Sequence, residues 1–245
     1  MPYRRLPNTD LARIKALEAA VAKNGAKVDG SLVIQYKSVQ DASNFLLNFR
    51  RVHQLYLQSF EQQVKASKKY QRQVKMARLY VSHFIQVLNM SVIRNEIKAE
   101  NKKLYDLDIH DHTVPDLSSD TTLLKWGESI IRGEDERIKS GGVPVYNPTI
   151  AKVKVHYSIF QEAYYNQKTL QNNTNRNLEK VSLMREKADE LILDIWNQVE
   201  ELFKDLPATD KLLNCQEFGV VYYYRTKEKK AMEAAKLQKK ISFND

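Results

Sequence analysis

The feature that most constrains this chain is a pair of long stretches without glycine or proline, residues 38–103 and 149–206. These two residue types most readily interrupt a helix, and the whole chain holds only 7 glycines and 6 prolines. Within both stretches large apolar residues recur every three or four positions, which is the period of an amphipathic helix. The pattern therefore predicts an all-α protein built on long helices.

Apolar positions of the first stretch are matched by apolar positions of the second. At one constant separation the pairs are Phe45 and Val153, Phe49 and Tyr157, Val52 and Phe160, and Tyr56 and Tyr164. At a separation shorter by a single position they are Val74 and Val181, Ala77 and Met184, Val81 and Ala188, Phe84 and Leu191, Leu88 and Ile195, and Val92 and Val199. Self-similarity at a nearly fixed period predicts an internal duplication, with pseudo-repeats at 6–108 and 115–206. The alternative is chance agreement between two amphipathic helices.

Each long stretch is interrupted by a polar patch, "KASKKYQRQ" at 65–73 and "QNNTNRN" at 171–177. We interpret both patches as hairpin turns, which gives four helices of about 30 residues in an up-and-down bundle. The first patch lacks glycine, proline and asparagine, so one continuous helix is the alternative there. The fold prediction is thus a four-helix bundle made from a duplicated long helical hairpin, with short extra helices and a minor strand pairing at one end.

The predicted domain organisation is a single helical domain over residues 1–225, of which 207–225 form a closing segment. A basic amphipathic tail over 226–245 follows it. Thr-Asp or Ser-Asp pairs precede three short helix-like runs, and such residues accept hydrogen bonds from the first helical turn. The expected caps are Thr9-Asp10, Ser119-Asp120 and Thr209-Asp210.

Several protein classes find no support in the sequence. The N-terminal residues lack the apolar run of a secretory signal, and no window approaches the roughly 18 apolar residues of a membrane span. Cys215 is the only cysteine, which excludes an intramolecular disulfide and a cysteine-rich zinc cage. We therefore expect a cytoplasmic protein without a membrane span.

No catalytic motif is present: the chain has no glycine-rich phosphate loop and no nucleophile elbow. None of its histidines follows a glutamate by three residues, as a ferritin-type di-iron site requires. The densest group of metal-ligating residue types is "DLDIHDHTVPD" at 106–116, in which Asp108, His110 and His112 alternate. Imidazoles with a carboxylate can hold zinc, manganese or iron, so these three residues are candidate metal ligands, and a polar inter-repeat loop is the alternative. We predict no enzymatic activity and no cofactor.

Charge is distributed unevenly along the chain, whose net charge is +9. Residues 62–95 contain no acidic residue, and five of their cations share one helix face. These five are Lys65, Lys68, Lys69, Arg72 and Lys75. By contrast, residues 186–205 hold seven acidic residues against Lys187 and Lys204.

Two functions fit this charge pattern. The favoured interpretation is a structural or protein-interaction module, which binds a protein partner or itself through charge-complementary faces. The alternative is sequence-nonspecific nucleic-acid binding by the basic stretch at 65–78 and the basic tail, with Tyr70 and Tyr80 stacking on bases.

Overall fold

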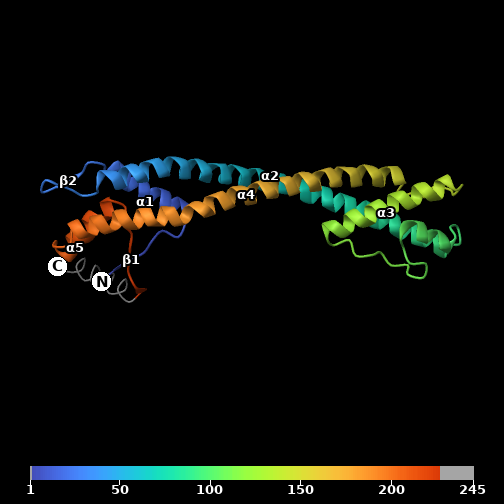
Figure 1. The fold of residues 1–245 in the computed structure, drawn as a ribbon. Coiled ribbons are helices and arrows are strands. Elements are labelled where there is room, and N and C mark those ends of the chain that lie inside the picture. The colour runs from blue at the N-terminus through green and yellow to red at the C-terminus, as the bar shows by residue number, and fades with distance from the viewer. Residues whose placement is uncertain (1, 227–245) are drawn as a thin grey trace, which may run out of the picture. The chain divides into compact units, whose positions relative to one another are not determined.

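The computed structural model describes residues 2–226, and within them the chain is all-α apart from two short strand pairs (Figure 1). The helices are α1 (Asp10–Ala22), α2 (Tyr36–Ile93), the 3₁₀ helix η1 (Ala99–Tyr105), α3 (Asp120–Lys139), α4 (Ile150–Leu202) and α5 (Ala208–Glu217). The strands are β1 (Tyr3–Arg4), β2 (Lys27–Val28), β3 (Ser31–Leu32) and β4 (Tyr222–Tyr223). The predicted all-α class is confirmed.

The two predicted hairpin turns are wrong, because α2 and α4 run unbroken through both polar patches as helices of 58 and 53 residues. For the patch at 65–73, the continuous-helix alternative is the one observed. The patches contain no glycine or proline, and their lysines, arginines and glutamines are good helix formers. In the second patch the hydroxyl of Thr174 donates to the carbonyl oxygen of Leu170 at 3.0 Å, so this side chain is satisfied without leaving the helix.

The chain divides into two compact units. Unit 1 comprises residues 1–57 and 176–245, and unit 2 comprises residues 58–175. Each long helix thus contributes to both units. The tail prediction for 226–245 falls almost entirely on residues 227–245, outside the described part.

Unit 1 packs α1, the first part of α2, the last part of α4 and α5 around one apolar core. Its largest fully buried side chains include Trp196, Phe49 and Leu17. Two antiparallel strand pairs belong to this unit, β1 with β4 and β2 with β3. The second pair is closed by Asp29 and Gly30, both with positive φ, as in a two-residue hairpin of type I′.

Unit 2 packs α3 and η1 against the last part of α2 and the first part of α4. Its core includes Phe84, Phe160 and Tyr105, all fully buried. No helix of the described chain is both long enough and apolar enough to pass through a membrane.

Two of the three predicted helix caps are present. The side chain of Thr9 accepts from the backbone N–H of Ala12 at 3.2 Å, and that of Ser119 accepts from Thr122 at 3.1 Å. The third prediction is wrong: α5 begins one residue before Thr209, and Pro207 occupies the N-cap position without a side-chain hydrogen bond. A proline at this position sets an extended entry into the helix.

Candidate binding site on helix α2

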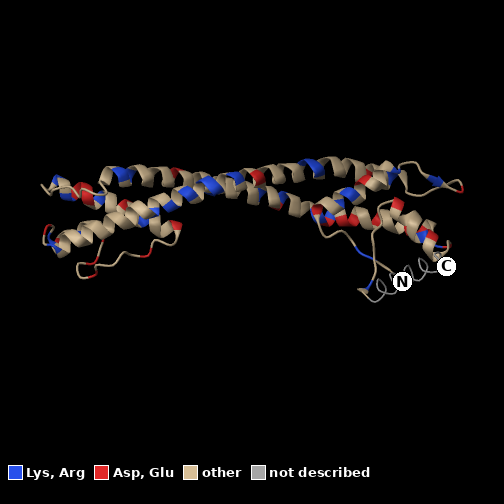
Figure 2. Ribbon diagram, turned by 180° about the vertical axis from the view of Figure 1, so that it is seen from behind, with Lys and Arg blue, Asp and Glu red and all other residues tan. Residues whose placement is uncertain are grey.

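The five predicted cations lie on the part of α2 that belongs to unit 2, and all five are exposed. We call Lys65, Lys68, Lys69, Arg72 and Lys75 the basic stripe (Figure 2). Lys65 forms an ion pair with Glu61 at 2.7 Å, one turn earlier on the same helix. The other four form no ion pair with any residue from 2 to 226. The stripe therefore carries four cations whose charge the described chain does not neutralise.

Tyr70 lies within the stripe but is engaged inside unit 2. Its hydroxyl donates to Oδ2 of Asp120, in the first turn of α3, at 2.5 Å. Burial, followed by this hydrogen bond, raises the pKa of Tyr70 far above its ordinary value. The phenol thus stays neutral and serves as a fixed link between α2 and α3.

Tyr80 is engaged as well. Its ring stacks on the imidazole of His156 from α4, with ring centroids 4.0 Å apart and planes only 14° from parallel. Both aromatic side chains that could have stacked on bases are therefore used in contacts within unit 2. Their place in the basic stretch is evident from the sequence, but these partners are not.

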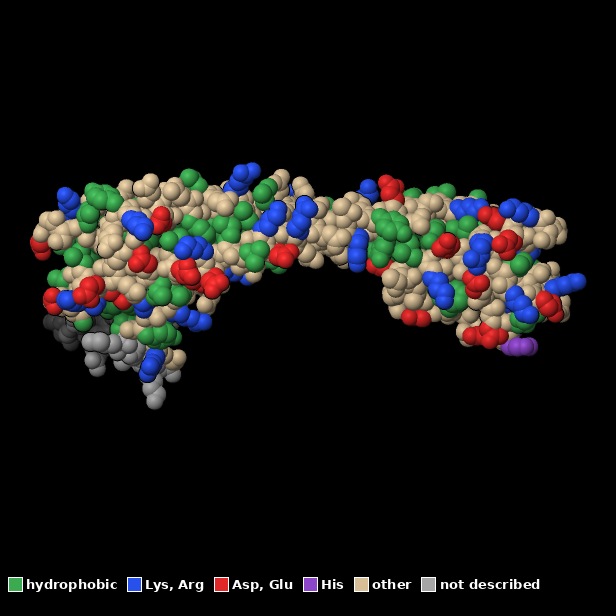
Figure 3. All heavy atoms as spheres, in the orientation of Figure 1, with side chains coloured by type: hydrophobic (Ala, Val, Ile, Leu, Met, Phe, Trp, Pro, Cys, Tyr) green, Lys and Arg blue, Asp and Glu red, His purple; other side chains and the backbone are tan. Residues whose placement is uncertain are grey.

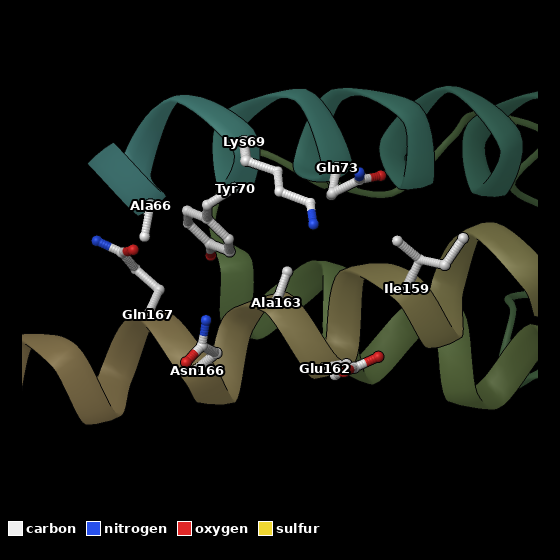
Figure 4. A pocket seen from close by; sticks show the side chains of 9 residues that line it. All are labelled: Ala66, Lys69, Tyr70, Gln73, Ile159, Glu162, Ala163, Asn166 and Gln167. Atoms are coloured by element: carbon white, nitrogen blue, oxygen red, sulfur yellow. The ribbon is translucent and has the colours of Figure 1, made fainter. Parts of the chain in front are cut away.

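A polar pocket of about 180 Å³ opens beside the stripe, between α2 and α4 within unit 2. Figure 4 shows Lys69 extending from α2 toward α4, with Gln73 one turn further along the same helix. Two small side chains, Ala66 and Ala163, leave the space open. Lys69 thus belongs both to the basic stripe and to this pocket.

Gln167, on the α4 side of the pocket, is a residue that the sequence prediction missed. It is only 6% exposed, and its Oε1 has no hydrogen-bond partner among the described residues. A buried amide oxygen without a partner is costly, so the pocket offers an unused hydrogen-bond acceptor. No sequence signal distinguishes Gln167 from the other polar residues around it, because its burial follows from the contact between the two helices.

The acidic residues of α4 that we expected to complement the stripe are largely engaged within unit 1. Arg13 donates to both carboxylate oxygens of Asp189 at 2.8 Å. Glu200 accepts from Arg4 at 2.9 Å and from the hydroxyl of Tyr222 at 2.6 Å. These carboxylates neutralise cations of their own unit, which leaves fewer of them for the basic stripe of another copy.

The candidate metal ligands Asp108, His110 and His112 are all exposed on the loop between η1 and α3. The carboxylate of Asp108 accepts from the backbone N–H of His110 at 2.9 Å, so it closes a local turn. Across residues 2–226, no three His, Cys, Asp or Glu side chains are grouped so that they could hold a metal ion. The metal site stays a prediction without a donor cage to support it.

The chain matches no known family model, no curated protein and no solved structure.

Proposed function

We propose that this protein is a non-enzymatic helical scaffold that binds an acidic protein partner through the basic stripe of α2. The observation that carries this proposal is the group of four exposed cations without an ion pair to any described residue. They lie within 68–75 on one helix, a length of about 12 Å, so their charges act on a partner together. A rigid helix face with unneutralised charge favours a partner of the opposite charge.

The alternative explanation is that the stripe is only a solvated helix face. The equivalent part of α4 argues against it. Val74 in the core of unit 2 is matched by Val181 in the core of unit 1. The same separation gives the positions on α4 that correspond to the four cations without an ion pair. These positions hold Asn175, Arg176, Glu179 and Ser182 in place of Lys68, Lys69, Arg72 and Lys75. A long helix of this kind therefore does not require a row of cations at these positions.

This correspondence depends on the internal duplication, which we infer for three reasons. Thr9 and Ser119 cap equivalent short helices, and most of the matched apolar positions are buried in both halves. The third reason is a pair of arginines, Arg78 and Arg185, at the same separation as Val74 and Val181. Arg185 donates to Asp10 at the start of α1, and Arg78 donates to two carbonyl oxygens just before the start of α3.

The pocket beside the stripe is lined by both cationic and acidic side chains. Lys69 and Gln73 line it on the α2 side and can donate hydrogen bonds, whereas Glu162 on the α4 side contributes a carboxylate of its own. The unpartnered atom of Gln167 is an amide oxygen, which accepts hydrogen bonds and so does not bind a carboxylate. We therefore expect the carboxylates of the partner to lie along the exposed cations of the stripe and not inside the pocket.

Nucleic acid is the second candidate, because a row of lysines and arginines also binds phosphates. Two observations weigh against it. Tyr70 and Tyr80 are held by Asp120 and His156, so neither ring is free to stack on bases. Phosphate contacts alone would remain, and these depend steeply on salt.

Binding measurements on the full-length protein test the proposal. The probes are polyglutamate, as a model acidic polypeptide, and DNA and RNA oligonucleotides of matched net charge. We expect the variant Lys68→Glu, Lys69→Glu, Arg72→Glu, Lys75→Glu to weaken polyglutamate binding by at least about tenfold at low salt. The matched control reverses four scattered exposed lysines, Lys37, Lys98, Lys152 and Lys180, and should retain most of the affinity.

Equal losses in the two variants would mean that only net charge matters, and the stripe would lose its role. Tighter binding of an oligonucleotide than of polyglutamate, abolished only by the stripe variant, would favour nucleic acid as the partner. An affinity for DNA and RNA that is undetectable at low salt would eliminate that candidate.

A further inference from the structure

The loop that follows α3 is fastened by a buried ion pair. Glu134 and Arg137 lie in the last turns of α3, and their side chains are 0% and 4% exposed. The carboxylate of Glu134 accepts from the backbone N–H of Val145 at 2.8 Å, and the guanidinium of Arg137 donates to the carbonyl oxygen of Val143 at 2.8 Å. Two backbone positions of the loop are therefore held by the same charged pair.

The pair itself is fully satisfied. Arg137 donates to Glu134 through Nε at 3.0 Å and through Nη2 at 2.9 Å, and the hydroxyl of Tyr105 donates to Glu134 at 2.5 Å. A buried ion pair contributes little net stability compared with apolar side chains of the same size, because both charges lose their hydration. What this pair does provide is one defined conformation for the loop.

That conformation places apolar side chains in water. Val145 is buried at 5% exposure and anchors the loop in the core of unit 2. Tyr146 and Val143 are 89% and 82% exposed, the highest values among the large hydrophobic residues of the described chain. Hydrophobic side chains reach the surface elsewhere too (Figure 3). Here two such side chains lie on one loop, and the buried Glu134–Arg137 pair holds the backbone of that loop.

A cavity of about 260 Å³ lies directly beside these two side chains. Val87 and Ile97 contribute to its apolar wall, and Val143 and Tyr146 line it from the loop. Arg94 and Glu96 also line it, but they pair with each other at 2.8 Å. The cavity is therefore neutral, partly apolar and adjacent to an exposed aromatic ring.

We propose that the loop over residues 141–147 and the cavity beside it form a self-association surface, occupied by the same surface of a second copy of this chain. Tyr146 of each copy inserts into the cavity of the other, with Val143 packed at its edge. This surface is separate from the basic stripe, so the inference does not depend on the proposed acidic partner.

Three observations favour a second copy as the occupant. The projecting ring and the receiving cavity lie side by side, which is the arrangement that a two-fold interface requires, since each copy must offer both. The Arg94–Glu96 pair leaves no net charge at the cavity, so two copies meet there without repulsion. Elsewhere, a chain with a net charge of +9 and an unneutralised basic stripe repels its own kind.

Sedimentation velocity on the full-length protein, up to hundreds of micromolar, tests this inference. We expect a dimer that does not weaken as salt is raised, because its contacts are apolar and salt screens the repulsion between two chains of net charge +9. Tyr146→Ser should weaken the dimer by at least about tenfold, since each dimer loses two buried aromatic anchors. The matched control is Leu183→Ser on unit 1, where Leu183 is 78% exposed, and it should leave the dimer unchanged.

A mixing experiment distinguishes the two-fold arrangement from general stickiness. Val87→Trp fills the cavity but keeps Tyr146, whereas Tyr146→Ser keeps the cavity wall that Val87 and Ile97 contribute but loses the ring. Neither variant can form a ring-in-cavity contact with itself, but a mixture of the two restores one such contact. The heterodimer should therefore be at least about tenfold tighter than either homodimer.

Three results would overturn the inference. The wild-type chain could remain monomeric at every concentration, Tyr146→Ser could leave the dimer unchanged, or the mixture could associate no better than its components. Circular dichroism of each variant, with a thermal midpoint near that of the wild type, establishes that the comparison is between folded proteins.

Discussion

The two units bury different kinds of side chains. Every buried serine, threonine, asparagine, glutamine, lysine, glutamate and arginine of the described chain lies in unit 2, between Ser59 and Thr174. Unit 1 has an apolar core, and its ion pairs, such as Arg13 with Asp189 and Arg4 with Glu200, lie at the partly exposed surface. Two assemblies of similar helices thus differ in where they place polar groups.

This difference indicates where the chain's specificity lies. A buried polar group adds little to stability even when it is satisfied, but it restricts the neighbouring backbone to the conformations that satisfy it. The buried side chains of unit 1 in the described chain are apolar. Unit 2 carries the basic stripe, the polar pocket and the fastened loop, so its buried polar groups fix the surfaces that we propose for binding.

The largest predicted effect is on the buried ion pair of unit 2. Glu134→Ala leaves the guanidinium of Arg137 buried without its carboxylate and should lower the free energy of unfolding of unit 2 by about 3–5 kcal/mol. Asp189→Ala in unit 1 removes a carboxylate that is 28% exposed, and should cost less than about 1 kcal/mol.

The chain's two tryptophans allow each unit to be followed by itself, because Trp126 lies in unit 2 and Trp196 in unit 1. Urea unfolding is followed by fluorescence in two single-tryptophan variants: Trp196→Phe leaves Trp126 to report on unit 2, and Trp126→Phe leaves Trp196 to report on unit 1. These experiments give the free-energy costs of Glu134→Ala and of Asp189→Ala. Equal losses in the free energy of unfolding for Glu134→Ala and Asp189→Ala would contradict the proposed difference between the two units.

A second prediction concerns Gly127, where α3 meets α4 in unit 2. A Cβ atom added there would lie 2.3 Å from ring carbons of Tyr157, a side chain that is only 6% exposed. Gly127→Ala should therefore destabilise unit 2 by about 1–3 kcal/mol despite alanine's better helix propensity. Adding Tyr157→Leu should restore most of the loss in the same urea experiment. A stabilising effect of Gly127→Ala alone would show that the ring moves freely.

The third prediction tests the equivalence of the two arginines that reach the short helices. Arg78→Met loses two hydrogen bonds to backbone carbonyl oxygens before α3, and Arg185→Met loses the carboxylate of Asp10 at α1. We expect each substitution to cost about 1–2 kcal/mol, and each in its own unit. A large loss at one arginine and none at the other would weaken the inferred duplication.

A smaller effect is expected at Asp106, which ends η1 with a positive φ of 56° that asparagine also tolerates. The hydroxyl of Ser129 donates to this carboxylate at 2.6 Å, and that bond, with the charge of Arg132, holds the pKa of Asp106 below its usual value. A carboxyl group whose pKa is lower in the folded state stabilises the fold at pH values above its unfolded-state pKa. This contribution to stability is lost as pH falls through the folded-state pKa.

Asp106→Asn should thus cost less than about 1 kcal/mol near neutral pH, because the group is largely exposed. The difference from the wild type should vanish in acid. Urea unfolding of unit 2 at several pH values measures it, and a cost that persists at low pH would point to a steric cause instead.

Much of this fold is predictable from the sequence, because helix length and core positions follow from periodicity and from the missing glycines and prolines. The hairpins were wrong because polarity alone does not end a helix: the patch around Thr174 keeps its backbone hydrogen bonds and remains helical. Burial of Gln167, Glu134 and Arg137 could not be predicted, since it results from contacts between helices far apart in sequence. The basic stripe was predictable because exposed charges on one helix need no tertiary contact to lie together.

Our central proposal is that the basic stripe serves binding and not folding. The most direct measurement compares Lys68→Glu, Lys69→Glu, Arg72→Glu, Lys75→Glu with the wild type in both thermal unfolding and polyglutamate binding. We predict a thermal midpoint close to that of the wild type, since the four side chains are exposed and without ion pairs to described residues, together with the loss of binding. A markedly lower midpoint, or binding that persists unchanged at low salt, would contradict it.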